Sequence, residues 1–301
     1  MVILLERFKF PVGIEVHNNK YKPPSTSLRS FRSEISNFMS QFLSKNLPLA
    51  GFDRYFEFIQ LTNNAFAKLV VDIEHPMCEW GAKTREQYLS YSLNLLDLLN
   101  AISSSISHLN QSKISNLYAL RLVESSPSFA AKRLKKIPKT TFDLGMDLKE
   151  EGWSVGIREK PNSKKETTVL DALTVVRRIG VLTLGLVLSS LCNDAKPYED
   201  VRKIVLGSDD SLIKDLDTIL GKDVEKTDGV IQEVNAAVDR LSADNSAGNW
   251  GKAAWDMKNL LETLENTIQG IEKKASSLFS EVLETRNELL AKFLGRQNMQ
   301  L

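Results

Sequence analysis

The segment TREQYLSYSLNLLDLLNAISSSISHLNQSKISNLYALRLVE, residues 84–124, decides the fold. It contains neither proline nor glycine, and its apolar residues recur every three or four positions. This pattern predicts one uninterrupted helix of about 40 residues, roughly 60 Å long. Thr84 and Gln87 have the spacing of a capping box, so we expect the helix to begin at Thr84. It is the first organising helix of an all-α protein.

A second long helix is predicted near the C-terminus, at about residues 252–294. Apolar residues keep a near-heptad spacing there, which is typical of a helix that packs along another helix. The neighbour is either a second chain or the first long helix of the same chain. Leu260 and Phe279 broaden the stripe beyond a two-helix seam, which favours packing within the chain. We expect an elongated multi-helix bundle with the two long helices antiparallel.

Shorter helices account for most of the remaining chain. Amphipathic spacing predicts them over residues 27–45, 53–74, 211–220 and 230–241, with another starting near Pro197. Ser163 and Glu166 have the spacing of a second capping box, which predicts a helix from there to Cys192. Ser126 and Pro127 match a capping residue followed by proline at the first helical position, which predicts a helix through residue 137. The expected organisation is a flexible leader (1–26), a single helical domain (27–294) and a tail (295–301).

Residues 138–163 are the least helical part of the sequence. Apolar and polar residues alternate there, which is the pattern of a β-hairpin. The segment is also rich in charge and glycine, which is typical of a mobile loop. Both interpretations stay open.

The most apolar stretch, residues 179–191, carries no charge. A membrane-spanning helix needs about 20 apolar residues, and this stretch is shorter and lies between Arg178 and Asp194. A buried core helix is therefore favoured over a membrane helix. Gly185 and Ser189, four residues apart, form a small-residue pair that lets another helix approach closely.

Composition excludes few functions. Lys plus Arg (39) and Asp plus Glu (38) nearly cancel, so no overall field favours nucleic acid, and no nucleic-acid partner is expected. Cys78 and Cys192 are too few for a disulfide framework, which fits a reducing compartment such as the cytoplasm. The first ten residues carry Glu6 and do not resemble a secretory signal.

No motif in the sequence predicts chemistry. His17, His75 and His108 lack partners at metal-ligand spacing, and there is no phosphate-binding glycine loop or nucleophile elbow. We predict no catalytic, cofactor-binding or metal-binding residue and no cofactor. Helical enzymes can assemble sites from scattered residues, but a binding protein is favoured over an enzyme.

Two groups of residues are candidate interaction patches. The basic residues Lys132, Arg133, Lys135 and Lys136 are either a solvated helix end that complements the helix dipole or a site for an anionic partner, and the first is favoured. Trp250 and Trp255 are either an exposed partner-binding patch or core anchors, and the core is favoured.

Five separated strings resemble the plant BYPASS family, in the same order along the chain. They are LTNNAFAKLVVDIEHPMCEW (61–80), YLSYSLNLLDLLNAISSSISHL (88–109), ALRLVESSPSFAAKRLKKIP (119–138), LCNDAKPYEDVRK (191–203) and LFSEVLETRNELL (278–290). The resemblance runs from about residue 31 to residue 294.

The resemblance implies a biological role and no reaction. Family members are needed for normal root and shoot growth and restrain a mobile root-derived signal linked to carotenoid-type metabolism. The family offers no agreed catalytic residues to carry over. Some members are placed in the chloroplast, and some relatives are linked to secretion through the exocyst.

Three hypotheses about function follow. The first is a non-enzymatic developmental regulator that binds protein partners, which the sequence does not identify. The second is a membrane-associated adaptor in exocyst-type vesicle traffic, suggested by residues 179–191 and the basic residues. The third is a carrier or enzyme for a small apolar metabolite, held in a pocket between helices. The oligomeric state stays open.

Overall fold

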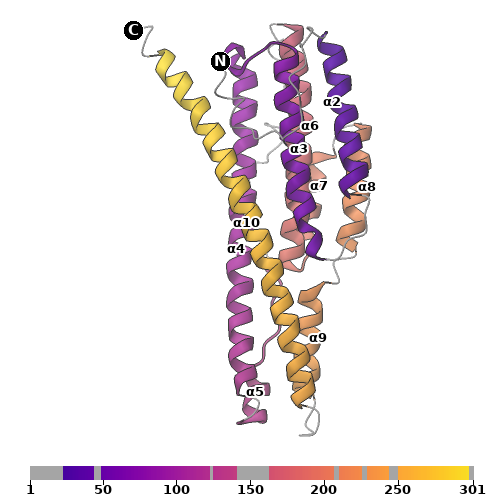
Figure 1. Ribbon diagram of the computed structural model, residues 1–301, viewed down its shortest axis with the longest axis vertical. Coiled ribbons are helices and arrows are strands. Elements are labelled where there is room, and N and C mark those ends of the chain that lie inside the picture. Colours follow the sequence, from indigo (N-terminus) through magenta and orange to yellow (C-terminus); the bar gives the residue numbers. More distant parts are fainter. Residues whose placement is uncertain are drawn as a thin grey trace.

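The computed structural model describes residues 23–43, 49–122, 125–140, 163–206, 210–225, 229–243 and 250–297. Every regular element in these ranges is helical, and the helices form one elongated bundle (Figure 1). The all-α bundle predicted from the sequence is therefore confirmed. The proposed leader, the tail and the segment 138–163 lie largely outside the described residues.

Most of the described chain lies in nine α-helices of very different length. They are α2 (Pro24–Phe38), α3 (Asp53–Asp72), α4 (Ala82–Arg121), α5 (Pro127–Arg133), α6 (Lys164–Cys192), α7 (Lys196–Val205), α8 (Ser211–Glu225), α9 (Val230–Ala243) and α10 (Trp250–Gln297). A π-helical turn, η1 (Met39–Leu43), extends α2, and short 3₁₀ turns, η2 (Leu49–Phe52) and η3 (Met77–Glu79), precede α3 and α4.

The two long helices, α4 and α10, lie side by side and run in opposite directions, as predicted (Figure 1). Lys113, near the end of α4, forms an ion pair with Glu265, in the first half of α10, at 2.9 Å. Arg286, near the end of α10, donates to the Ser92 hydroxyl in the first part of α4 at 2.7 Å. These two contacts fix one antiparallel register along both helices. The predicted packing of the second long helix within the chain is confirmed.

Helix α6 forms the centre of the bundle. It packs against α2, α3, α4, α7 and α8, and its apolar residues join the main hydrophobic core. Among the described residues it is the one helix long and apolar enough to cross a membrane, but 89% of the window that meets this criterion is buried inside the protein. Contacts with neighbouring helices thus account for its apolar composition, as the favoured interpretation of residues 179–191 predicted.

The small-residue pair in α6 faces α7. A Cβ on Gly185 would lie 3.3 Å from Val201 Cγ2, so α7 already packs closely at this point. The Ser189 hydroxyl accepts a hydrogen bond from the Tyr198 backbone N–H at 2.7 Å and thereby satisfies a donor in the first turn of α7. The predicted close approach at Gly185 and Ser189 is confirmed.

The start of α4 differs from the prediction. The helix begins at Ala82, so Thr84 lies inside the first turn and does not cap it. Its hydroxyl instead donates to Glu166 Oε1, at 2.7 Å, and the Gly81 N–H donates to the same oxygen at 2.8 Å. The Gln87 side chain accepts from Arg177 at 3.2 Å. The predicted capping box of α4 is therefore wrong, because a carboxylate from α6 satisfies the donor at the start of α4.

The start of α6 was predicted correctly in part. Ser163 is the N-cap, and its hydroxyl accepts from the Glu166 N–H at 3.1 Å. The Glu166 side chain, which is buried, crosses to α4. Ser163 and Glu166 therefore act as a cap that joins the first turns of two helices.

Helix α5 is shorter than predicted. It ends at Arg133, and residues 134–140, here named the strap, carry no helix. Asn116 of α4 binds both the N–H and the C=O of Lys135, each at 3.0 Å. Asn235 of α9 binds the N–H and C=O of Ile137 at 2.7 and 3.2 Å. The side-chain amides of Asn116 and Asn235 thus satisfy backbone groups that a further helical turn would have paired. The predicted helix end at residue 137 is therefore wrong.

Candidate functional site: an apolar face on the two long helices

Exposed large apolar side chains gather on α4 and α10. Six such residues are exposed in the described part of the chain, and five of them lie on these two helices. The five are Leu93, Ile114, Tyr118, Trp255 and Leu283. Single exposed apolar residues are ordinary on protein surfaces, whereas a group of them on adjacent helices is a candidate interaction site.

Three of these residues lie near the same end of the helix pair. Ile114 and Tyr118 are one turn apart on α4, with exposed fractions of 62% and 54%. Trp255, at 64%, lies near the start of α10, which the antiparallel register brings beside the last turns of α4. Ile114, Tyr118 and Trp255 are here named the apolar face.

Each of the three side chains lies off the buried stripe of its own helix. In α4, at about 100° per residue, Ile114 lies about 140° from the buried positions Leu109 and Ala119. Tyr118 lies about 180° from Leu109 and about 100° from Ala119 by the same rule. In α10, Trp255 lies about 200° from buried Met257 by the same rule. Each exposed position therefore lies away from the core-facing stripe of its own helix.

Of the two candidate tryptophans, the structure describes the side chain of Trp255. Trp255 is exposed, so the prediction that it anchors the core is wrong. It lies off the buried stripe of α10, to which Met257 and Leu261 belong. The side chain of Trp250 lies outside the described residues. Sequence reasoning missed Ile114 and Tyr118, although their four-residue spacing off the buried stripe of residues 84–124 was a usable signal.

The candidate basic residues do not form one helix end. Lys132 and Arg133 lie in the last turn of α5, as the dipole interpretation requires, whereas Lys135 and Lys136 belong to the strap. Arg133 stacks over the Phe129 ring, 4.8 Å from its centroid. All four cations are exposed. Figure 1 places α5 at the same end of the bundle as the start of α10, so both candidate patches occupy that end.

The buried polar clusters are structural contacts between helices. Asp217 of α8 accepts from the Tyr198 hydroxyl at 2.9 Å and from Arg202 Nε and Nη2 at 2.7 and 2.9 Å. Burial, together with the Asp217 charge, raises the pKa of Tyr198. A tyrosine held in its neutral form against a paired carboxylate joins α7 to α8 and has no acid–base role at neutral pH.

The two cysteines differ in burial. Cys192 is buried, and burial raises the pKa of its thiol to about 11, while a contact with the Ser105 hydroxyl at 3.6 Å lowers it less. Its thiol stays protonated and unreactive at neutral pH. Cys78 is exposed.

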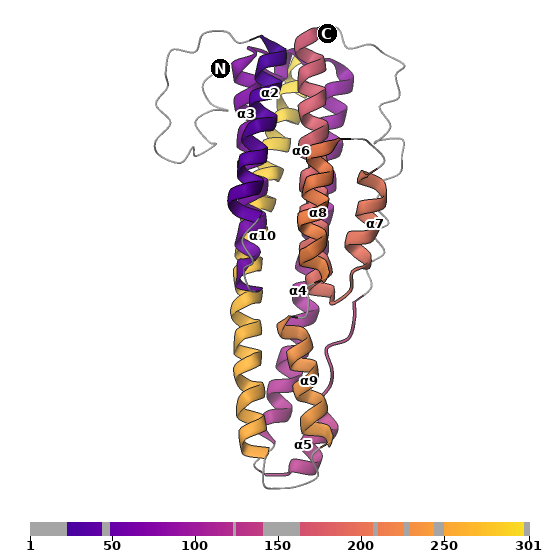
Figure 2. The ribbon, with the colours of Figure 1, turned by 90° about the vertical axis from the view of Figure 1, so that its right-hand side faces the viewer.

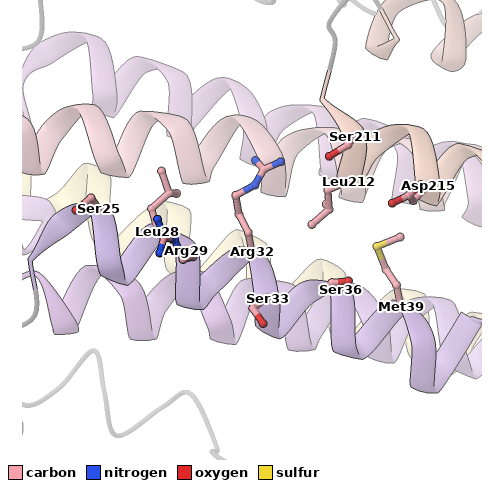
Figure 3. A pocket seen from close by; sticks show the side chains of 10 residues that line it. All are labelled: Ser25, Leu28, Arg29, Arg32, Ser33, Ser36, Met39, Ser211, Leu212 and Asp215. Carbon is pink, nitrogen blue, oxygen red and sulfur yellow. The ribbon is translucent and has the colours of Figure 1, made fainter.

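Surface grooves offer little chemistry. One, of about 540 Å³, lies between α2 and α8, with Ser33, Ser36 and Met39 on one wall and Leu212 and Asp215 on the other (Figure 3). Arg32 at this groove is neutralised by Asp210, which accepts from both of its terminal nitrogens. A second groove, of about 600 Å³, lies between α9 and α10.

No group of three or more His, Cys, Asp or Glu side chains that could hold a metal ion occurs in the ranges that the structure describes.

Comparisons with known proteins identify the family. The family described as "Protein BPS1" matches residues 77–291, which is more than half of the chain and includes all of α4 to α9. The Arabidopsis thaliana protein named "Protein BPS1, chloroplastic" is 30% identical over 103 residues, covering 33% of this chain and 30% of that protein. No solved structure matches the chain significantly.

Rice relatives extend the match at lower identity. "UPF0496 protein 4" of Oryza sativa subsp. japonica is 22% identical over 77% of this chain, and its counterpart from subsp. indica is 22% identical over 67%. The match spans 51% and 49% of these two proteins, so this chain corresponds to about half of their length. The family expected from the five strings is confirmed, and the chain belongs to the BPS1 (BYPASS) family of plant developmental proteins.

Proposed function

We propose that this protein is a non-catalytic developmental regulator that binds a partner protein through the apolar face. The observation that supports binding is the exposure of Ile114, Tyr118 and Trp255 near the same end of two helices held in fixed register. The resemblance supplies the biological role: restraint of a mobile root-derived signal linked to carotenoid-type metabolism. In this account the protein acts on that signal through its partner.

The residue types of the apolar face suit protein recognition. Tryptophan and tyrosine are enriched among the residues that contribute most to binding free energy. Burying a large apolar side chain stabilises a complex by about 1.5–3 kcal/mol, so the three together contribute a large favourable share of the binding free energy. Because the face runs along two antiparallel helices, its matching partner is an amphipathic helix that lays an apolar stripe against them.

The test uses a double variant, Tyr118→Glu with Trp255→Glu. Both positions are exposed, so the variant keeps its fold and melting temperature while charge replaces the apolar face. The matched control is Gln111→Glu with Asn266→Glu, which adds the same charge at exposed positions of the same helices. Each form is introduced into plants that lack the gene, and co-purifying root proteins are identified.

The expected result is that the control restores normal root and shoot growth and retains its partner, whereas the Tyr118→Glu, Trp255→Glu variant loses both. If the double variant accumulates to normal levels and restores growth fully, the proposal is wrong.

A further inference from the structure

We propose that a basic strip formed by α5 and the strap binds the anionic headgroups of a lipid bilayer. The basic strip consists of Lys132, Arg133, Lys135, Lys136 and Lys139. It is separate from the apolar face, and its function is tested independently.

The backbone that carries the strip is fixed to the bundle. Asn116 binds Lys135 on both its N–H and its C=O, and Asn235 does the same for Ile137. Leu134 and Ile137 are buried, so they anchor the strap while the lysines between and beyond them are exposed. Because the strap is held at four backbone groups, binding an anionic surface does not require it to be ordered first.

Most of the charge on the strip is available. Lys132, Lys135 and Lys139 make no ion pair with any carboxylate in the described part of the chain. Lys136 pairs with Asp239 at 2.7 Å, but both side chains are more than half exposed. An exposed pair of this kind contributes about 0.2–1 kcal/mol and exchanges readily for another anion. The protein as a whole carries a net charge of only +1, so this concentration of cations is local.

Phe129 favours a bilayer over an acidic protein segment. Its ring is 45% exposed, and it lies one turn before Arg133, whose guanidinium covers one side of the ring. An exposed aromatic ring among cations is the composition that sits at the headgroup level of a membrane, where the ring is buried and the charges meet phosphate. Figure 2 places α5 at the extreme lower end of the molecule, with the strap rising beside α9. An end that protrudes from the molecule contacts a flat bilayer directly and needs no matching groove in its partner.

The experiment measures binding of the full chain to lipid vesicles by sedimentation. One set of vesicles is pure phosphatidylcholine, and the other contains about 30% phosphatidylserine, which gives the negative surface potential of a cytoplasmic leaflet. Binding is expected to the anionic vesicles alone and to weaken as salt is raised, because salt screens charges at the surface.

A triple variant locates the site. Lys132→Gln with Lys135→Gln and Lys136→Gln removes three charges and should weaken binding on the order of a hundredfold, at the contribution typical of lysines near an anionic surface. The matched control is Lys203→Gln with Lys222→Gln and Lys273→Gln. These lysines are also exposed, and one of them, Lys203, likewise pairs with an aspartate. The control should bind as the natural protein does.

Phe129→Ser tests the apolar contribution and should weaken binding severalfold even at high salt. The proposal is overturned by equal binding to both kinds of vesicle or by equal losses in the two triple variants. It is also overturned if soluble polyglutamate binds the strip while anionic vesicles do not, which would assign the strip to an acidic protein partner.

Discussion

Lys113 of α4 donates to the Glu265 carboxylate of α10 at 2.9 Å, and this ion pair sets the register of the helices that carry the apolar face. The lysine side chain is only 8% exposed, whereas that of Glu265 is 40% exposed. Loss of the partner therefore costs more free energy for the buried lysine than for the exposed glutamate. A buried ammonium without a carboxylate is costly, and an exposed carboxylate without a lysine is hydrated.

Glu265→Gln should therefore lower the free energy of unfolding by about 1 kcal/mol or more, because it leaves the buried ammonium unpaired. Lys113→Met replaces the buried charge with an apolar side chain of similar length and should be close to neutral. Urea denaturation of both variants measures the difference. A greater loss in Lys113→Met than in Glu265→Gln would contradict this account of the pair.

The Glu166 carboxylate links the first turns of α4 and α6. Glu166→Ala should lower the free energy of unfolding by about 1–3 kcal/mol, because it leaves the Thr84 hydroxyl and the Gly81 N–H without their acceptor. In a double-mutant cycle, Glu166→Ala and Thr84→Ala should be non-additive by roughly 0.5 kcal/mol or more. Additive effects would show that the two side chains are not coupled.

Two helices end on a residue in the left-handed conformation. Glu74, after α3, and Asn193, after α6, both have φ of 51°. Asparagine tolerates this conformation well, and glutamate does not. Glu74→Gly should therefore stabilise the protein by about 0.5–1 kcal/mol, whereas Asn193→Ala should destabilise it by a similar amount. Thermal unfolding of the two variants distinguishes these opposite signs.

Glu281 of α10 makes the stability of the protein depend on pH. Burial raises the pKa of its carboxyl, and a hydrogen bond from Gln60 at 3.4 Å lowers it less. The pKa of this carboxyl is therefore higher in the folded state than in the unfolded state. Its contribution to the free energy of unfolding is fully present below the unfolded pKa. That contribution is lost as the pH rises through the folded pKa.

Glu281→Gln is uncharged at every pH and should be more stable than the natural protein at pH 7. The advantage should vanish below about pH 4, where the carboxyl is protonated in both states. Unfolding midpoints at the two pH values test this, and an advantage that persists in acid would contradict it.

The helices were predictable because their signals are local. The apolar stripe of residues 84–124 and the heptad spacing of residues 252–294 each mark one long helix, and the structure has both, within about three residues at each end. The burial of residues 179–191 followed from their length and flanking charges. Family membership followed from strings of sequence, which no physical argument would have supplied.

Two of the errors involve side chains that act across the fold. Thr84 has the residue type and spacing of a cap, but the acceptor it meets lies on α6, 82 positions later. The end of α5 depends on Asn116 and on Asn235, which is 98 positions from the residue it binds. For Trp255 the core was favoured over an exposed patch, and the residue is exposed because it lies off the buried stripe of α10. Sequence spacing carries no record of such contacts.

Site-specific photo-crosslinking in roots tests the central claim most directly. A photoreactive phenylalanine analogue is placed at position 118, at position 255, or at the exposed control position 222 on α8. The account predicts that positions 118 and 255 are linked to the same partner protein and that position 222 is not. If neither 118 nor 255 gives an adduct in plants that the protein rescues, or if all three positions give the same adducts, the apolar face is not the binding site.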